Sequence, residues 1–328
     1  LSMVTKTRDY SENRYSFVSQ GVSYNGNPSD YFSLENMNVI PGTSSSATDY
    51  LYLRDDTDIQ NSYDAFQTVL GAYTMMNISP SENIDINLGL RLEATEMLLE
   101  SDKLDDETLL SELEQNFRGS LNVLDVLPSL NMKFKLAEMD LRVTNYRFSA
   151  SQSVARPLFR EKAPFSVFDF EIQEQQTGNT ALNRTKIVNI DNRFEVYPGL
   201  GELFSFSLFY KHFTDPIEQV IISTSSNTEI TWKNVDRAQL FGLELEMKKN
   251  LGFLSERLNA FNIAFNATYI QSATSIAEDE LMEIRSTDPD HKDTRPIYGQ
   301  SPYIINNTLN YTNDSLGLSI NTGFIIMI

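Results

Sequence analysis

The sequence predicts an all-β protein, and more narrowly an antiparallel transmembrane β-barrel of which about eleven strands are present. Apolar and polar residues alternate with period two in repeated segments of about ten residues, which is typical of barrel strands. The segments are joined by connections that alternate between long and short. Phe and Tyr are abundant, at 20 and 15 residues against a single Trp, and both favour strands.

Composition narrows the possible classes. The 328 residues are enough for one large or two ordinary domains. No apolar run is long enough for a transmembrane helix and the mean hydropathy is -0.32, which excludes a helical membrane protein but not a barrel. The absence of Cys excludes disulfides and thiolate chemistry. A formal charge of -19 argues against a nucleic-acid partner, because binding phosphates requires a cationic surface.

The clearest strand pair lies within Asn183–Thr214. In the first half apolar residues alternate with polar ones, as in Phe194, Glu195 and Val196, and the second half begins with the run FSFSL. A Pro-Gly turn at Pro198 joins the halves. Each strand therefore has one apolar and one polar face. A soluble sandwich could use such a hairpin, and so could a membrane barrel with its polar face in a wet lumen.

The other elements follow from the same alternation. The expected strands are Leu1–Thr7, Ala65–Ile78, Ile84–Thr95, Val123–Leu136, Met139–Ser151, the two within Asn183–Thr214, Gln239–Lys249, Leu258–Ile270, Tyr303–Tyr311 and Leu316–Ile328. The expected long loops are Arg8–Gln60, Glu96–Asn122, Gln152–Leu182, Asp215–Val235 and Gln271–Gln300. Within the second loop, Asp105–Phe117 has apolar residues at helical spacing and could form a short helix.

The connection lengths favour the barrel over the sandwich. Outer-membrane barrels have short periplasmic turns and long extracellular loops, whereas a sandwich shows no such strict alternation. We expect one edge of the sheet to carry the short turns at Ser79–Glu82, Ala137–Glu138, Pro198–Glu202, Gly252–Glu256 and Asn313–Asp314. We expect these side chains to face lipid: Ile86, Leu88, Leu90, Phe204, Phe206, Leu208, Leu245, Phe261, Ile263, Phe265 and Ile305.

Both ends of the chain are abrupt. Leu1 is not followed by a signal peptide, and the final GFIIMI stops within an expected strand. We interpret residues 1–328 as a partial barrel from a longer protein.

Several segments resemble one family in order and spacing. They include LPSLNMKF, LRVTNYRFSASQSVARPLF, TGNTALNRTKIVNIDNRFEVYP, GELFSFSLFYKHFTDPIE, AQLFGLELEMKKNL and RPIYGQSPYIINNTLNYTNDSLGLSINTGF. Over most of Ile59–Ile328 the chain resembles the second half of a TonB-dependent outer-membrane receptor. The resemblance is strongest to the Bacteroidetes type, which carries an N-terminal carboxypeptidase-regulatory-like domain.

The resemblance implies a barrel of about 22 strands whose lumen holds a plug domain. It implies import of a nutrient ligand (a glycan, a peptide or a metal chelate) across the outer membrane of a Gram-negative bacterium. It also implies TonB, outer-membrane lipid and, in some relatives, a surface lipoprotein as partners. The plug, the TonB-contacting segment and the terminal strands have no counterpart in these residues, so no ligand-binding residue is carried over.

No catalytic, cofactor or metal site is predicted. His212 lies three residues before Asp215 and could be written as a dyad, but we favour the interpretation that it is a polar residue at a barrel rim. Two acidic clusters could bind a hard cation, although neither has calcium-loop spacing, and we favour a solvated loop for both; they are Asp55, Asp56 and Asp58, and Asp288, Asp290, His291 and Asp293. Arg156 precedes Pro157, which we expect to end a strand. We expect Arg156 to face the lumen or a neighbouring loop carboxylate, in a structural role rather than in contact with substrate. Gly242 indicates a bulge or a close backbone approach.

Three function classes remain open. Transport through a plugged barrel is the leading hypothesis. A structural or adhesive β-barrel without active transport is the alternative, and an enzymatic barrel comes third. Substrate-contacting residues are not readable from the sequence, because loop tips carry no general code.

Overall fold

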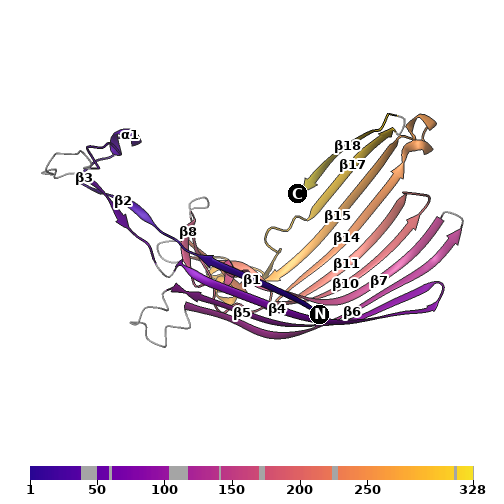
Figure 1. Ribbon diagram of the computed structural model, residues 1–328, viewed down its shortest axis with the longest axis horizontal. Coiled ribbons are helices and arrows are strands. Elements are labelled where there is room, and N and C mark those ends of the chain that lie inside the picture. Colours follow the sequence, from indigo (N-terminus) through magenta and orange to yellow (C-terminus); the bar gives the residue numbers. More distant parts are fainter. Residues whose placement is uncertain are drawn as a thin grey trace.

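A curved antiparallel sheet forms most of the computed structural model (Figure 1). The structure describes residues 1–37, 50–58, 61–102, 117–139, 142–169, 174–223, 228–313 and 316–327. In spatial order the sheet contains β1 (Ser2–Tyr10), β4 (Tyr63–Ser81), β5 (Ile84–Ser101), β6 (Arg118–Met139), β7 (Arg142–Ala155), β10 (Thr185–Tyr197), β11 (Leu203–Thr214), β14 (Arg237–Asn250), β15 (Phe261–Ser275), β17 (Tyr303–Asn313) and β18 (Leu318–Met327). Short β16 (Thr294–Arg295) pairs with β15. The prediction of about eleven antiparallel strands is therefore confirmed.

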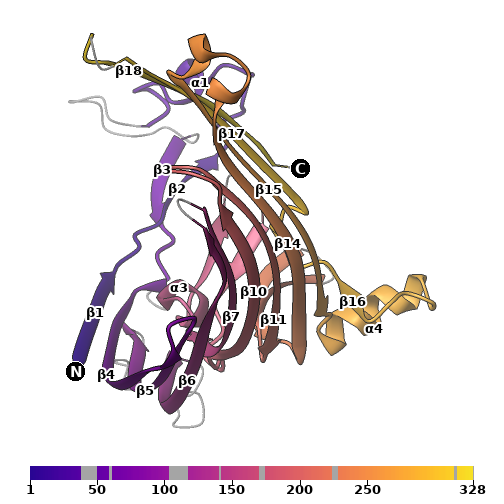
Figure 2. The same ribbon diagram turned by 90° about the vertical axis from the view of Figure 1, so that its right-hand side faces the viewer.

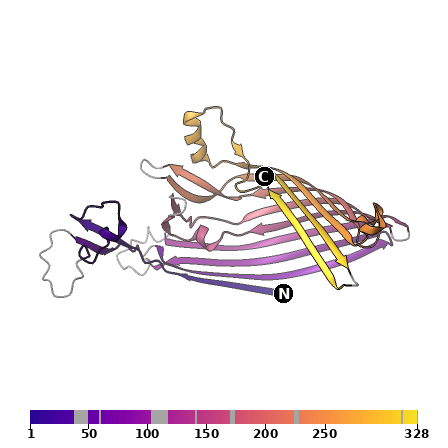
Figure 3. The same cartoon turned by 90° about the horizontal axis from the view of Figure 1, so that it is seen from above.

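The short turns lie together at one end of the sheet, which we call the turn end, and the long connections lie at the other, the loop end (Figures 1 and 3). The Pro198–Glu202 turn is where the sequence predicts it, between β10 and β11. The Gly252–Glu256 turn is longer than expected and contains two short 3₁₀ helices, η3 (Leu251–Phe253) and η4 (Glu256–Leu258).

Two predicted turns are misplaced. β4 continues through Ser79–Ser81, with a register shift after Ile78, so of the predicted Ser79–Glu82 turn only Glu82 lies outside the strand. β6 continues through Ala137–Glu138 to Met139, with an irregularity after Lys135, and β7 begins only at Arg142. The bulge breaks the side-chain alternation there, which explains why the predicted strand ends three residues early, at Leu136 and not at Met139. Residues 140–141 and part of the Asn313–Asp314 turn lie outside the described residues, as does the helix expected at Asp105–Phe117 except for its last residue.

All five expected loops are wrong in part, because they contain regular structure; Gln271–Gln300 contains α4 (Glu278–Thr287) and β16. Arg8–Gln60 includes β2 (Tyr15–Gln20), α1 (Pro28–Tyr31) and β3 (Tyr50–Asp55), which form an arm beyond the loop end (Figure 1). Gln152–Leu182 includes α3 (Phe159–Lys162), β8 (Ser166–Asp169) and β9 (Glu174–Thr177). Asp215–Val235 is a hairpin of β12 (Ile217–Ser223) and β13 (Thr228–Asn234). β5 and β6 extend into Glu96–Asn122.

The register gives the main sheet two chemically different faces. It pairs Leu88 with Leu130 and Phe206 with Leu245, and by the same alternation it places all eleven predicted lipid-facing residues on one face. We call this the outer face. The inner face carries the polar residues of the same strands. At the loop end α3 lies against this face (Figure 2), and β8 packs there through Val167.

Aromatic pairs mark two levels on the outer face. The ring centroids of Phe261 and Tyr311 lie 4.9 Å apart, and those of Tyr269 and Tyr303, on the same two strands, lie 5.1 Å apart. Eight residues separate the pairs along β15, a span of about 27 Å in an extended strand. Aromatic girdles about one hydrocarbon thickness apart are typical of membrane barrels. Among the described residues, no helix is long and apolar enough to cross a membrane.

The loop end has small cores of its own. The sheet β12-β13-β9-β8 lies beside α3, and the buried Tyr63, Leu99 and Leu121 of the main sheet pack against Ala163 and Phe165. A second cluster joins Val220 and Val235 to Ala277, next to α4 (Glu278–Thr287). The connection between β7 and β10 is therefore folded inward against the wall.

Candidate functional site

The inner face gathers charged side chains from strands that are far apart in sequence. In a barrel this face borders the lumen, where polar residues are hydrated, whereas the apolar outer face borders lipid. Side chains that could bind a hydrophilic ligand therefore lie on the inner face. Two charged regions stand out on it, one across β7, β10, β11 and β14 and one at the loop end of β1, β4 and β5.

The first region is an ion-pair ladder centred on Glu195, whose side chain is 3 % exposed. Its carboxylate accepts hydrogen bonds from Asn145 Nδ2 at 3.2 Å, Arg147 Nε at 2.7 Å and Arg193 Nε at 3.2 Å. Arg193 also reaches Glu246 at 2.9 Å, on a strand two places away. Because a buried carboxylate is costly without partners, these donors explain how Glu195 is accommodated.

The serines of β11 make this reach possible. In the pairing of β10 with β11, Ser205 lies opposite Glu195 and Ser207 lies opposite Arg193. Both serines are buried beneath the charged side chains. Their small size leaves space for the guanidinium of Arg193 to cross β11 toward β14. The run FSFSL thus gives one face bulky Phe side chains and the other face the space for an ionic ladder.

The second region is a clamp formed by Arg91, Glu93 and Arg156. The Glu93 carboxylate pairs with Arg91 Nε at 2.6 Å and also with the Arg156 guanidinium, which donates from its Nε to Thr95 Oγ1 at 2.8 Å. Arg156 follows the end of β7, so the clamp fastens the start of the inward-folded connection to β5. A cavity of about 370 Å³ lies here on the inner face, between Lys6, Arg91 and Arg156 and below Pro157.

The connection after Arg156 is fixed by tight packing. The buried Lys162 donates from Nζ to the carbonyl oxygens of Thr180 and Leu182, at 2.5 and 2.6 Å. Burial lowers the pKa of Lys162 to about 8. At Gly178 an added Cβ would lie 1.9 Å from the Ala163 carbonyl oxygen, so only glycine fits this crossing. The part of the β7–β10 connection beside the clamp cavity is therefore held in place by specific contacts.

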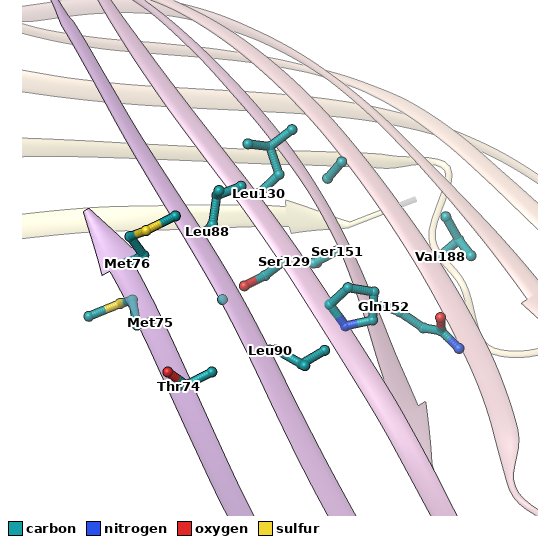
Figure 4. A pocket seen from close by; sticks show the side chains of 13 residues that line it. Thr74, Met75, Met76, Leu88, Leu90, Ser129, Leu130, Ser151, Gln152 and Val188 are labelled. Carbon is teal, nitrogen blue, oxygen red and sulfur yellow. The ribbon is translucent and has the colours of Figure 1, made fainter. Parts of the chain in front are cut away.

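A second depression, of about 620 Å³, lies between the apolar side chains of β4, β5, β6 and β10 (Figure 4). Leu88, Leu90, Leu130 and Val188 line it, and all belong to the outer face. It has no charged lining residue, and on this face it would border acyl chains rather than an aqueous ligand.

The candidate residues Arg156, His212 and Asp215 do not form one site. Arg156 lies on the inner face, but its carboxylate partner is Glu93 of the wall and not a loop residue. His212 lies on the outer face of β11 opposite Val188, whereas Asp215 begins the next loop with φ 53 and its carbonyl oxygen accepts bonds from Thr185 and Asn234. Along the described part of the chain no bond joins His212 to Asp215.

The two acidic clusters are occupied by local contacts. Asp56 pairs with Arg54 Nε at 2.5 Å, and Asp55 accepts from the Thr57 amide at 2.9 Å. His291 Nδ1 lies 3.1 Å from Asp288 in an exposed loop. Within the described ranges, no group of three or more His, Cys, Asp or Glu side chains is arranged to hold a metal ion.

Sequence reasoning missed the ladder and the clamp. The polar alternation of β5, β10 and β14 showed that Glu93, Glu195 and Glu246 share the polar face, but it could not show which cations meet them. The available signal was opposite charge two residues apart on one strand, as in Arg91 and Glu93 or Arg193 and Glu195, since such residues point to the same face.

Comparisons with known proteins agree with this architecture. Residues 3–324 match the family model described as TonB dependent receptor-like, beta-barrel. Among solved structures, the copper transporter OprC is 16% identical with a TM-score of 0.53, over 87% of this chain and 38% of OprC. The hemophore receptor HasR of Serratia marcescens, solved as a double mutant with its hemophore HasA and heme, is 11% identical with a TM-score of 0.55, over 99% of this chain and 52% of HasR.

A further solved structure, the siderophore receptor PirA from Pseudomonas aeruginosa, is 13% identical with a TM-score of 0.49, over 85% of this chain and 49% of PirA. The chain thus spans about half of these structures or less. Identities this low show a shared fold only. No curated protein matches the chain.

Proposed function

The chain belongs to the family of TonB-dependent receptor-like β-barrels, and from this premise we propose that it forms part of the wall of an outer-membrane importer. The family consists of transport receptors and not of enzymes. The proposed cargo is a nutrient ligand, such as a glycan, a peptide or a metal chelate. The proposed location is the outer membrane of a Gram-negative bacterium.

One observation carries this proposal: the same strands combine an apolar outer face with an inner face of buried ion pairs. Glu195 and Arg193 would be costly on a surface that faces lipid, and Leu88 and Phe206 would be poorly placed on a surface that faces water. A wide barrel with a hydrated lumen accommodates both. The segregation of short turns and long loops to opposite ends of the sheet also supports an outer-membrane barrel.

The proposal includes partners that lie beyond these residues. Residues 1–328 would be a partial barrel of a complete wall of about 22 strands around a plug. TonB would supply energy through segments outside this chain, outer-membrane lipid would surround the outer face, and a surface lipoprotein could cap the loop end. Nucleic acid is not proposed as a partner, because the formal charge is -19.

Uptake by cells that carry the full-length gene tests the proposal. Growth or uptake on candidate nutrients is compared in strains with and without TonB, and with the inner membrane de-energised. We expect uptake only with TonB and an energised membrane. Undiminished uptake without TonB would instead indicate a passive pore, and no uptake with any nutrient would favour a structural or adhesive barrel.

A further inference from the structure

A small cavity of about 110 Å³ lies on the inner face at the loop end, two residues along β1 from the clamp cavity. Its floor consists of three aromatic rings from distant parts of the chain. Tyr10 lies 5.3 Å from Tyr63 between ring centroids, and Tyr63 stacks on Phe165 at 6.4 Å. Tyr63 and Phe165 are buried members of the loop-end core, and Tyr10 packs against that core.

Two guanidinium groups flank this floor. Arg8 lies 5.3 Å from the centroid of Tyr10, and Arg160 lies 5.8 Å from the centroid of Phe165. Arg8 is on β1, whereas Arg160 is on α3, so the inward folding of the β7–β10 connection brings the two together. We call Arg8, Arg160 and the three rings the arginine cage.

Neither arginine of the cage has a carboxylate partner within 4.0 Å among the residues that the structure describes. Arg160 donates to the amide oxygen of Gln176 at 2.6 Å, a neutral acceptor. This is unexpected in a chain with 45 acidic and 26 basic residues, where the arginines of the clamp and the ladder are all paired. Two arginines held at one cavity without an anion leave their charge available to a ligand.

The size and chemistry of the cavity select the group that fits. Its volume corresponds to roughly three or four water molecules at about 30 Å³ each. A carboxylate, phosphate or sulfate group is of this size, and the planar guanidinium fork of Arg binds such oxyanions with paired, charge-assisted hydrogen bonds. The aromatic floor excludes water from one side, which strengthens these bonds.

We propose that the arginine cage binds an oxyanion group of the imported ligand, so that the cargo is an anionic molecule. This inference rests on the proposed function, because it assigns the ligand class to the same lumen. The larger clamp cavity, with Lys6 and Arg91 on its lining, continues along the same face and would hold the adjoining part of the ligand. The cage would thus provide charge selection at the loop end, before transport.

Calorimetric titration of the detergent-solubilised full-length protein tests the cage directly. The probes are phenyl phosphate, benzoate and benzenesulfonate, with benzyl alcohol as the uncharged control. We expect at least one anionic probe to bind and benzyl alcohol not to bind. Loss of one charge-assisted contact corresponds to about tenfold in affinity, so Arg8→Gln and Arg160→Gln should each weaken binding about tenfold.

The controls separate charge from folding. Arg257→Gln changes an exposed arginine at the turn end and should leave binding unchanged. Arg160→Lys keeps the charge but loses the fork, so it should bind more tightly than Arg160→Gln. If Arg160→Gln disturbs the connection, Arg8→Gln decides, because the Arg8 side chain makes no hydrogen bond among the described residues and folding should not depend on it.

The inference is overturned if no anionic probe binds, if benzyl alcohol binds as well as the anions, or if Arg8→Gln binds like the wild type. These measurements need neither TonB nor a membrane potential. Anion binding that depends on Arg8 together with uptake that does not depend on TonB would refute the proposed function but not the cage. TonB-dependent uptake with unchanged binding in Arg8→Gln would refute the cage but not the importer.

Discussion

At the scale of single residues, the exceptions to the strand pattern are informative. Phe209 is an aromatic side chain on the inner face of β11, where its neighbours Ser207 and Lys211 are polar. Directly opposite, β14 carries Gly242. A Cβ at Gly242 would lie 2.2 Å from Phe209 Cζ, so the ring lies over the glycine backbone. The close approach predicted from Gly242 is therefore confirmed, and Phe209 is its cause.

This contact predicts that substitutions at Gly242 and Phe209 are coupled in their effects on stability. Gly242→Ala should reduce the free energy of unfolding by about 1–3 kcal/mol, because the added methyl group overpacks against the Phe209 ring. In a Phe209→Leu background the same substitution should cost much less, since the ring is gone. Urea unfolding of the full-length protein in detergent or lipid measures both differences. An equal cost in the two backgrounds would show that the strain lies in the backbone and not in the ring.

The site residues show where single-residue prediction stops. The alternation showed that Glu195 and Glu246 share the polar face, because register and face follow from period two. That Arg193 crosses β11 to join them depends on the size of Ser205 and Ser207 in three dimensions. The arginine cage was beyond prediction, because Arg8 and Arg160 meet only when α3 folds inward.

At the scale of elements, strand cores were predictable and strand lengths were not. β5 matches its predicted start at Ile84 but continues to Ser101, six residues past the predicted end at Thr95. Beyond Thr95 the inner face carries apolar residues such as Met97 and Leu99, which belong to the loop-end core. The contrast between a polar inner face and an apolar outer face therefore disappears. β12 and β13 were missed for a related reason, because a short hairpin in a polar connection lacks a full membrane-length pattern.

The two faces of β5 predict opposite tolerance to charge. Leu88→Arg places a charge on the apolar outer face and should cost about 2–4 kcal/mol of folding free energy near the bilayer midplane. Asn87→Arg is the matched control, because Asn87 and its partner on β6, Asn131, both lie on the polar inner face. Equilibrium folding of the full-length protein into lipid vesicles measures both. If the two arginines are tolerated equally, the assignment of the outer face to lipid is wrong.

At the scale of the whole molecule, the sheet is polarised along its strands. The turn end has compact connections, such as Pro198–Glu202, whereas the loop end carries the arm, the inward-folded connection and α4 (Figures 1 and 3). The sheet order ends in β1 and β18, whose outward edges have no partner strand among the described residues. Open edges are not tolerated in the hydrocarbon layer, so insertion requires further strands that complete the wall.

Polarity along the strands predicts which positions the cell exterior can reach. This chain contains no Cys, so a single cysteine can be placed at either end of the sheet, in a full-length protein from which any Cys outside this chain has been removed. A membrane-impermeant maleimide should label Asp290→Cys, in the exposed loop after α4, in intact cells. It should label Glu256→Cys, in the β14–β15 turn, only after the outer membrane is permeabilised. The reason is that long loops face outward and short turns face the periplasm in barrels of this kind.

Equal labelling of denatured samples confirms that both thiols are intact. Labelling of Glu256→Cys in intact cells would invert the orientation, and the arginine cage would then lie at the periplasmic mouth, where it could not select ligands from outside.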